Sequence, residues 1–256
     1  MTDVTKCIGC WKCVEACSET YNLGPAIPTQ TDMGDGLSDT CWTTIIERSG
    51  QNFVRKFCLH CNDPACVSAC IVGALQKTPE GPVIYDEKKC IGCRYCMMAC
   101  PYGIPRYEWQ KPVPFIKKCI FCYPRLKEGQ QPACVEACPT QATIFGKRSD
   151  LLKEAWQRIK AHPDRYIQHV YGEKEVGGTS MLFIAGIPLD FLGWKPDVGE
   201  KNIPKLTWAA LNKVPWIASG MGAAMLGLWW IIERRTRLAE QKIEEEGKAQ
   251  SEGNQS

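Results

Sequence analysis

The sequence has no large excess of charge of one sign. Its 256 residues contain 31 Lys and Arg against 28 Asp and Glu, for a formal net charge of +3. The basic residues are scattered along the chain, which argues against nucleic acid as a partner. The sequence also has no P-loop, no nicotinamide-binding fingerprint and no pairing of a nucleophile with a base. These absences argue against a catalytic role.

Long hydrophobic runs are also rare before residue 180, so aliphatic layers alone do not account for the core. The abundant residue is cysteine, which occurs 17 times. The chain is too long for a small disulfide-stapled module, and an odd number of cysteines would leave one thiol over in a fully paired framework. The spacing of the cysteines is therefore more informative than their number.

Sixteen cysteines form four quartets, and Cys41 stands apart. The quartets are Cys7, Cys10, Cys13 and Cys17; Cys58, Cys61, Cys66 and Cys70; Cys90, Cys93, Cys96 and Cys100; and Cys119, Cys122, Cys134 and Cys138. The first and third have the spacing C-x2-C-x2-C-x3-C, which is typical of bacterial [4Fe–4S] ferredoxins. The segments CIGCWKCVEAC and CIGCRYCMMAC repeat one motif, which indicates an internal duplication.

This spacing suits a cubane cluster, in which each iron needs one thiolate. Three cysteines two residues apart can supply three of the four thiolates from one tight loop whose backbone N–H groups point at the sulfurs. The fourth cysteine, three residues further on, is expected to begin a helical turn and to serve another cluster, as in two-cluster ferredoxins. Because the clusters and their loops would supply much of the core, we expect the chain to fold badly without them.

Three other uses of cysteine fit the spacing less well. Structural zinc takes its ligands from two C-x2-C pairs, which does not explain a third cysteine at x2 and a fourth at x3. Disulfides are disfavoured because cysteines this close in a tight loop rarely have the Cα separation that a bridge requires. Radical-SAM enzymes need C-x3-C-x2-C, and the sequence does not contain it.

Some residues near the quartets have roles that the sequence leaves open. Four lysines stand just before a quartet: Lys6, Lys56, Lys89 and Lys118. They either offset the negative charge of the clusters or are solvated loop residues. His60 is expected to lie beside the ligands or on the surface, because its quartet is already complete. Cys41 is expected to be a small buried apolar residue.

Between the quartets the pattern predicts short elements. Residues 42–47 and 52–57 read as the two strands of a hairpin, and Val83–Tyr85 and Thr143–Phe145 as short strands. Asp150–Ala161 has the apolar spacing of a helix.

The C-terminal part changes character. Val214–Ile232 is a run of 19 residues without formal charge, which would span about 28 Å as a helix. Trp216 lies near one end and Trp229 and Trp230 near the other, as in an aromatic belt, and small residues at four-residue spacing permit close approach of another helix. We therefore predict a transmembrane helix in contact with lipid; a buried core helix is the alternative.

The charges around this run predict its orientation. Basic residues precede it at Lys201, Lys205 and Lys213, and follow it at Arg234, Arg235, Arg237 and Lys242. The slight excess after the run predicts a cytoplasmic tail, which is expected to extend the helix and then fray. The sequence shows no signal peptide and no twin-arginine motif before Cys7.

The predicted fold is α+β, with duplicated bacterial-ferredoxin-like modules built from short strands and cluster-binding loops, plus one C-terminal transmembrane helix. The predicted domains are a four-cluster ferredoxin-like domain at 1–170, an extension and linker at 171–213, the transmembrane helix at 214–232 and a charged tail at 233–256.

The quartets, with their x2-x4 and x2-x11 variants, resemble those of the four-cluster iron–sulfur subunits that accompany molybdopterin or tungstopterin oxidoreductases and some nickel–iron hydrogenases. The likeness covers residues 1–200. The C-terminal helix, preceded by YGEKEVGGTSMLF from Tyr171 to Phe183, is similar more narrowly to that of the β subunit of respiratory formate dehydrogenase and the ferredoxin subunit of membrane-bound hydrogenase.

This resemblance implies that the first quartet pairs with the fourth and the second with the third. The implied [4Fe–4S] ligand sets are Cys7, Cys10, Cys13 and Cys138; Cys58, Cys61, Cys66 and Cys100; Cys90, Cys93, Cys96 and Cys70; and Cys119, Cys122, Cys134 and Cys17. It further implies electron transfer from a catalytic subunit to a membrane cytochrome b-type subunit that reduces quinone, with the globular domain on the periplasmic side of the cytoplasmic membrane.

Three hypotheses follow. The first is an electron-transfer subunit of a membrane-bound formate dehydrogenase that contains molybdenum or tungsten. The second keeps this role but has a nickel–iron hydrogenase as the catalytic partner. The third is a metal-stabilised scaffold that anchors a partner to the membrane without redox chemistry.

Overall fold

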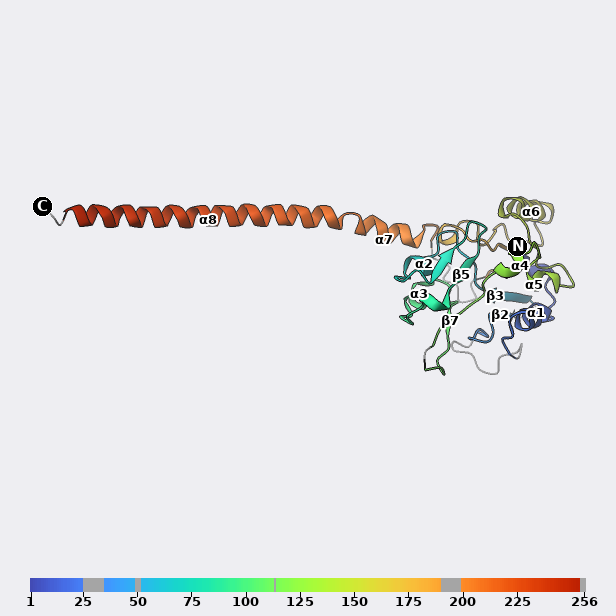
Figure 1. Cartoon of the computed structure of the whole chain (residues 1–256). Coiled ribbons are helices and arrows are strands. Elements are labelled where there is room, and N and C mark those ends of the chain that lie inside the picture. Colours follow the sequence, from blue (N-terminus) through green and yellow to red (C-terminus); the bar gives the residue numbers. More distant parts are fainter. Residues whose placement is uncertain (25–34, 49–51, 113, 190–198, 254–256) are drawn as a thin grey trace. The chain divides into compact units, whose positions relative to one another are not determined.

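The computed structural model describes residues 1–24, 35–48, 52–112, 114–189 and 199–253, with residues 48 and 246–253 described by their backbone alone. The chain divides into two compact units, Met1–Lys205 and Leu206–Ser256. The first unit combines short helices with short strands, and the second is helical (Figure 1). The predicted α+β class is therefore confirmed.

The strands form four two-stranded sheets. The longest is a hairpin of β2 (Thr43–Arg48) and β3 (Asn52–Phe57), paired antiparallel from Thr43 opposite Phe57 to Arg48 opposite Asn52. The other pairs are β4 (Leu75–Lys77) with β5 (Val83–Tyr85), β6 (Arg106–Tyr107) with β7 (Ile116–Lys117), both antiparallel, and β1 (Thr2–Asp3) with β8 (Phe183–Ile184), which is parallel.

Two of the predicted strand regions are therefore confirmed, and one is not. The hairpin and the strand Val83–Tyr85 are present as expected. In Thr143–Phe145, only Thr143 pairs, through an isolated bridge to Thr2. The strand expected at Thr143–Phe145 is wrong because β1 forms its two-residue ladder with β8, and a single bridge joins it to this segment.

Four short helices carry cysteines, and each begins one residue before the third cysteine of a quartet. They are α1 (Lys12–Tyr21), α2 (Ala65–Ser68), α3 (Tyr95–Ala99) and α5 (Ala133–Glu136). The other helices of this unit are α4 (Tyr123–Lys127) and α6 (Arg148–Ala161), with 3-10 turns at Val4–Lys6, Glu87–Lys89 and Glu175–Gly177. Helix α1 packs against α5, and α2 against α3.

Aliphatic side chains pack in several small clusters between the cysteine loops. The largest includes Val54 and Phe57 of β3 together with Leu59 and Phe183, and half-buried cysteines lie against it. A second cluster joins Ile159 on the apolar face of α6 to residues around β8, which confirms the predicted helix. The core is thus divided among the cysteine sites.

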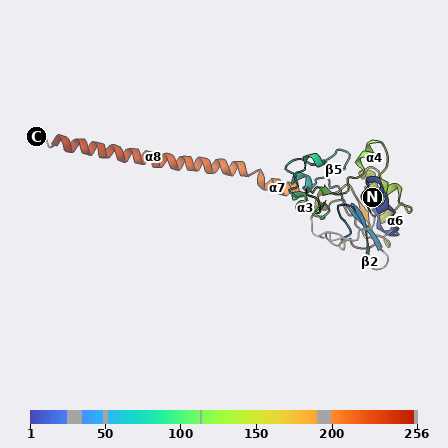
Figure 2. The same ribbon diagram turned by 60° about the horizontal axis from the view of Figure 1, so that its bottom comes forward.

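The second unit contains the end of α7 (Ile203–Leu211) and the whole of α8 (Val214–Gly253), which is one continuous helix (Figures 1 and 2). The helical stretch Ile203–Glu245 is long and apolar enough, by length and composition, to cross a membrane. Its apolar side chains are exposed, with 82% of Trp216 and 67% of Leu226 accessible. A large exposed apolar surface of this kind is typical of a membrane or protein contact.

Candidate iron–sulfur cluster sites

The helices determine how the third and fourth cysteines of each quartet are arranged. The helix begins just before the third cysteine and not at the fourth, which corrects the expectation from the sequence. Cys13 and Cys17, for example, both lie in α1, four residues apart, so they project from one side of the helix about one turn, or about 6 Å, apart. One helix can therefore present its two cysteines to two neighbouring sites.

The four C-x-x-C loops share one backbone conformation. The residue before the second cysteine has positive φ in each loop: 65° at Gly9, 49° at His60, 68° at Gly92 and 60° at Phe121. Glycine adopts this left-handed conformation without strain, whereas His and Phe do so at a cost. Loops with the same turn are thus built from two glycines and two strained residues, as is common at functional sites.

Aromatic rings cover these turns. A Cβ atom on Gly9 would lie only 2.5 Å from the Phe53 ring, and one on Gly92 would lie 2.5 Å from the Tyr107 hydroxyl, which donates to the Gly92 carbonyl oxygen at 2.8 Å. In the other two loops, His60 and Phe121 stack on each other, with ring centroids 5.0 Å apart. An aromatic ring therefore lies against each of the four turns.

Backbone N–H groups point at cysteine sulfurs, as expected for cluster loops. Gly92 donates to Cys90 Sγ and Phe121 donates to Cys119 Sγ, both at 3.4 Å. Ala74 donates to Cys70 Sγ at 3.2 Å. Such bonds stabilise the thiolate that binds iron.

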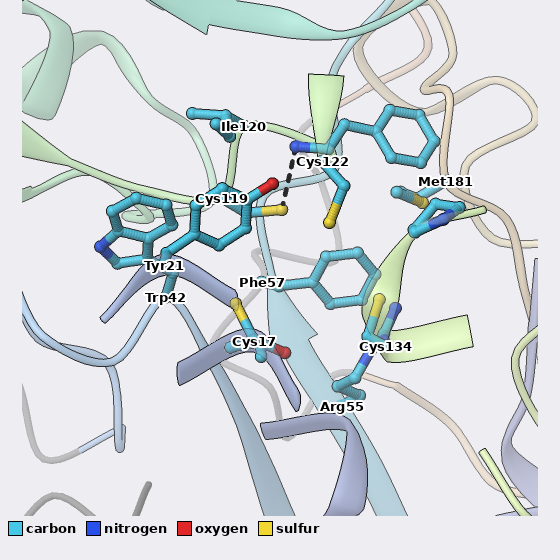
Figure 3. A pocket seen from close by; sticks show the side chains of 13 residues that line it. Cys17, Tyr21, Trp42, Arg55, Phe57, Cys119, Ile120, Cys122, Cys134 and Met181 are labelled. Carbon is cyan, nitrogen blue, oxygen red and sulfur yellow. Dashed lines mark hydrogen bonds between the residues drawn. The ribbon is translucent and has the colours of Figure 1, made fainter. Parts of the chain in front are cut away.

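One group of cysteines lines a cavity that encloses about 400 Å³ of space not filled by protein atoms, part of it open to solvent. The cysteines are Cys17, Cys119, Cys122 and Cys134. Figure 3 shows their side chains extending into one region among the rings of Tyr21, Trp42 and Phe57. Cys17 belongs to the first quartet and the other three to the fourth.

A second group lines a separate cavity of about 390 Å³ by the same measure, also partly open to solvent. Its cysteines are Cys7, Cys10, Cys13 and Cys138. Here the fourth quartet contributes one cysteine and the first quartet three. We name these two spaces, with their cysteines, the first cavity (Cys7, Cys10, Cys13 and Cys138) and the fourth cavity (Cys17, Cys119, Cys122 and Cys134).

We assign the remaining eight cysteines to two further groups from the thiols whose charges act on Cys61 and on Cys96. Burial raises the pKa of Cys61, and the neighbouring Cys58, Cys66 and Cys100 raise it further. Burial likewise raises the pKa of Cys96 to about 11, with added effects from Cys70, Cys90 and Cys93. We name these groups the second site (Cys58, Cys61, Cys66 and Cys100) and the third site (Cys70, Cys90, Cys93 and Cys96).

The chemistry of the donors fits an iron–sulfur cluster. All seventeen cysteines are free thiols. Burial raises the pKa of Cys13 to about 11 and that of Cys66 to about 12, so thiolates at these positions need a positive partner. Among the described residues, no three His, Cys, Asp or Glu side chains could hold one metal ion. Four thiols spaced too widely for one ion fit a larger inorganic core better than zinc.

The groups follow one another in space. Cys134 of the fourth cavity adds to the effect of burial in raising the pKa of Cys13 of the first cavity. Cys58 of the second site acts in the same direction on Cys119 of the fourth cavity. Cys96 of the third site does so on Cys66 of the second site. These charge effects link the groups in the order first cavity, fourth cavity, second site, third site.

The four lysines that precede the quartets lie in different surroundings, and whether they offset cluster charge stays a prediction. Lys118 is buried, with Nζ donating to the carbonyl oxygens of Val83 at 2.6 Å and Cys119 at 3.1 Å, and its charge acts on Cys66. Lys56 is buried in an ion pair with Asp35. The other two are more accessible: Lys6 is half-buried and Lys89 exposed.

His60 and Cys41 are both buried. His60 is wholly enclosed, and its Nδ1 accepts a hydrogen bond from the Val83 N–H at 2.9 Å. It therefore lies beside the ligand loops, and the surface alternative is wrong. Cys41 packs with Val14 and Ile45, and this confirms its predicted apolar role.

Arg55 is a site residue that the sequence analysis missed. Its side chain is 3% exposed and lines both the first and the fourth cavity. The signal that could have identified it is the alternation within β3. Phe53, Arg55 and Phe57 are two residues apart, so they share one face of the strand. That face covers the Gly9 turn with Phe53 and lines the fourth cavity with Phe57.

Four groups of thiols, held by short helices and by loops that direct N–H groups at sulfur, define a ferredoxin-type electron carrier. Comparison with known proteins agrees. Residues 50–148 match a 4Fe-4S dicluster domain. The chain is 37% identical over 245 residues to the iron-sulfur subunit of nitrate-inducible formate dehydrogenase from Escherichia coli (strain K12), which covers 89% of this chain and 82% of the relative.

Two further relatives have other partners in their names. The hydrogenase-2 operon protein HybA of Escherichia coli O157:H7 is 37% identical over 230 residues, covering 74% of this chain and 70% of the relative. The probable anaerobic dimethyl sulfoxide reductase chain YnfG of Escherichia coli (strain K12) is 41% identical over 154 residues, covering 58% and 73%. The chain belongs to this family of 4Fe-4S iron–sulfur subunits, which transfer electrons in oxidoreductase complexes and are not their catalytic subunits.

Proposed function

We propose that each of the four cysteine groups holds one [4Fe–4S] cluster, and that this subunit passes electrons between a catalytic subunit of the formate dehydrogenase type and a membrane cytochrome b-type subunit that reduces quinone. The observation that carries this proposal is that two separate cavities are each lined by four cysteines, three from one quartet and one from another. The proposed ligands are the sixteen cysteines in the sets that the family resemblance implies.

The residues of the chain hold and space the redox centres. Each [4Fe–4S] cluster, when bound, accepts and releases one electron. The C-x-x-C loops direct N–H groups at the sulfurs, and the rings of Phe53 and Tyr107 pack against the Gly9 and Gly92 turns. Helix α1 sets the spacing between two neighbouring sites, because it carries both Cys13 and Cys17, which belong to different sites.

The two ends of the row reach the surface, as a relay requires. Cys10 in the first cavity and Cys93 in the third site are the exposed members of their groups. Beside them, Ile8 is 58% and Ile91 is 62% exposed, in the same position of the repeated CIGC motif. Apolar residues beside both terminal sites are suited to contact partner subunits.

The helix α8 supports a membrane-bound complex, since its exposed apolar surface is long enough to cross the bilayer. We place the globular unit on the periplasmic side, with Arg234, Arg235 and Arg237 after the apolar run on the cytoplasmic side. Proteolysis of right-side-out vesicles should remove the globular unit if this orientation is right. Cleavage confined to inside-out vesicles would contradict it.

A second candidate partner is a nickel–iron hydrogenase, which is favoured by the equal identity of 37% to HybA. Formate dehydrogenase is preferred because that relative matches a larger share of this chain, 89% against 74%. Purifying the complex through a tag on this subunit and assaying formate and hydrogen oxidation distinguishes the two. A partner without molybdenum, tungsten or nickel would contradict both.

Metal analysis separates electron transfer from a merely structural role. Anaerobically isolated protein should contain about 16 iron and 16 sulfide per chain, and its brown colour should bleach with dithionite. Zinc without sulfide, or clusters that do not cycle between two redox states, would favour the scaffold hypothesis.

A further inference from the structure

A buried guanidinium lies between the first and the fourth cavity. Arg55 is in the middle of β3 and lines both spaces. Its partner across the hairpin, Ile45, lines the first cavity, whereas Thr43 and Phe57, which pair two residues along the ladder, line the fourth. The hairpin thus lies between the two spaces, and the Arg55 side chain lines both of them.

The surroundings of Arg55 leave its charge available to the thiols. The guanidinium carbon lies 3.9 Å from the centroid of the Phe57 ring, which positions the group from one face. Its Nε and Nη1 are buried and have no hydrogen-bond partner among the residues that the structure describes. Figure 3 shows the guanidinium beside Cys134. An unpartnered donor in a buried site is costly, so these nitrogens need an acceptor in the loaded protein.

The charge of Arg55 acts on thiols of both cavities. Although burial opposes the charged form, Cys134 of the fourth cavity and Cys13 of the first raise the pKa of Arg55. Arg55 in turn counteracts the effect of burial on Cys13 and on Cys17. A guanidinium keeps its charge under all ordinary conditions, which makes it a fixed cation at this position.

On the basis of the proposed function, we infer that Arg55 is a positioning residue for electron transfer, a fixed cation shared by the first and fourth clusters that raises the reduction potentials of both. Reduction adds one electron to a cluster that is already an anion. A buried cation beside it stabilises the reduced state more than the oxidised state, because the reduced state carries more negative charge.

The test is a redox titration monitored by EPR on the purified full-length complex. In Arg55→Met, the midpoint potentials of the first and fourth clusters should become more negative by at least about 59 mV. For one electron, this shift lowers the ratio of reduced to oxidised cluster tenfold at a given potential. The midpoint potentials of the clusters at the second and third sites should shift less. Lys153→Met, which removes an exposed positive charge from α6, is the matched control and should leave all four unchanged.

Unchanged midpoints of the first and fourth clusters in Arg55→Met would overturn the inference. If Arg55→Met and Arg55→Gln lack these two clusters, Arg55→Lys decides: loading restored by a lysine supports a role of the charge, and continued loss overturns it. Failure of the proposed function would give a different result, because the wild-type protein itself would then lack four redox-active clusters. The inference fails alone if wild-type protein has them and the Arg55→Met potentials do not move.

Discussion

The two pairs of cysteine sites differ in how their buried cations are used. Beside the first and fourth cavities, Arg55 reaches thiols directly and keeps two nitrogens without a partner among the described residues. Beside the second and third sites, Lys118 and Lys77 each give their ammonium to oxygen atoms: Lys118 to Val83 and Cys119, and Lys77 to His60, Gly81 and Ser180.

Even adjacent residues of one strand show this difference. Lys56 follows Arg55 and points from the other face of β3, where it forms an ion pair with Asp35 at 2.8 Å. The comparison teaches that a buried positive charge near cysteines is not in itself a redox residue. Its partners decide whether it acts on the sulfurs or holds the backbone together.

The largest expected effect is the loss of one cluster, and it tests which sites are paired. Cys138→Ser should remove or perturb the cluster of the first cavity, because Cys138 lines that cavity with Cys7, Cys10 and Cys13. Iron should fall by about four atoms per chain. Cys134→Ser, the matched control from the same helix region, should affect the fourth cavity. EPR spectra in which both variants lose the same signal would contradict this assignment.

The next effect concerns stability on the other face of β3. Asp35 lies 2.8 Å from Lys56 Nζ and 2.5 Å from Arg106 Nη2, and all three side chains are largely buried. Asp35→Asn removes a shared negative charge from beside two buried cations, so the free energy of unfolding should fall by about 3–5 kcal/mol. Guanidinium unfolding monitored by circular dichroism measures this. Glu200→Gln, which removes an exposed ion pair with Lys174, should change little.

The same group predicts a dependence on pH. Burial acts to raise the pKa of Asp35, but Arg106 and Lys56 outweigh it and lower the pKa below its ordinary value of 3.8. The stabilisation is therefore fully present above that value and is lost as the pH falls through the lower folded-state pKa. Unfolding measured below pH 4 should show this loss in the wild-type protein and not in Asp35→Asn. An equal acid dependence of both proteins would exclude Asp35 as its origin.

A smaller effect is expected for Lys118. Lys118→Met leaves the carbonyl oxygens of Val83 and Cys119 without this donor, which should cost about 1–3 kcal/mol of unfolding free energy. The charge acts on Cys66 through space, so the second cluster should shift to more negative potential, but less than the first and fourth clusters do in Arg55→Met. Redox titration of both variants checks the order. A larger shift of midpoint potential in Lys118→Met than in Arg55→Met would contradict this difference between the two pairs of sites.

The smallest effect isolates the strained turn at Phe121. Phe121→Ala and Phe121→Gly both lose the stacking on His60, but only glycine relieves the positive φ of 60°. The glycine variant should therefore be more stable than the alanine variant by about 1 kcal/mol. Paired unfolding curves measure the difference. Equal stability of the two variants would show that this turn relaxes when the ring is removed.

The sequence predicted local features well because these depend on spacing. The quartets, the hairpin around β2 and β3, and the helix α6 follow from motifs and periodicity within short segments. The sixteen ligand assignments stay predictions, although the structure brings the cysteines into four groups that match them.

Long-range contacts were not predictable in this way. The parallel pairing of β1 with β8 joins Thr2 to Phe183, and no local pattern indicates it. The role of Arg55 depends on which face of β3 meets the cavities, and the stacking of His60 on Phe121 joins loops of two different quartets. Such contacts are fixed by tertiary packing, which leaves no periodic signal in the sequence.

The cysteine-bearing helices have a consequence for how the protein matures. On the proposed ligand sets, each helix and the residues just after it supply the third and fourth cysteines of a quartet to two neighbouring sites, so filling one site with iron and sulfide also orders a ligand of the next. Maturation within each pair should be cooperative, with chains carrying half of a pair scarce at every stage of loading. A cell making this subunit would then hold mainly empty or completed pairs, and a shortage of iron would lower the number of finished molecules more than the content of each.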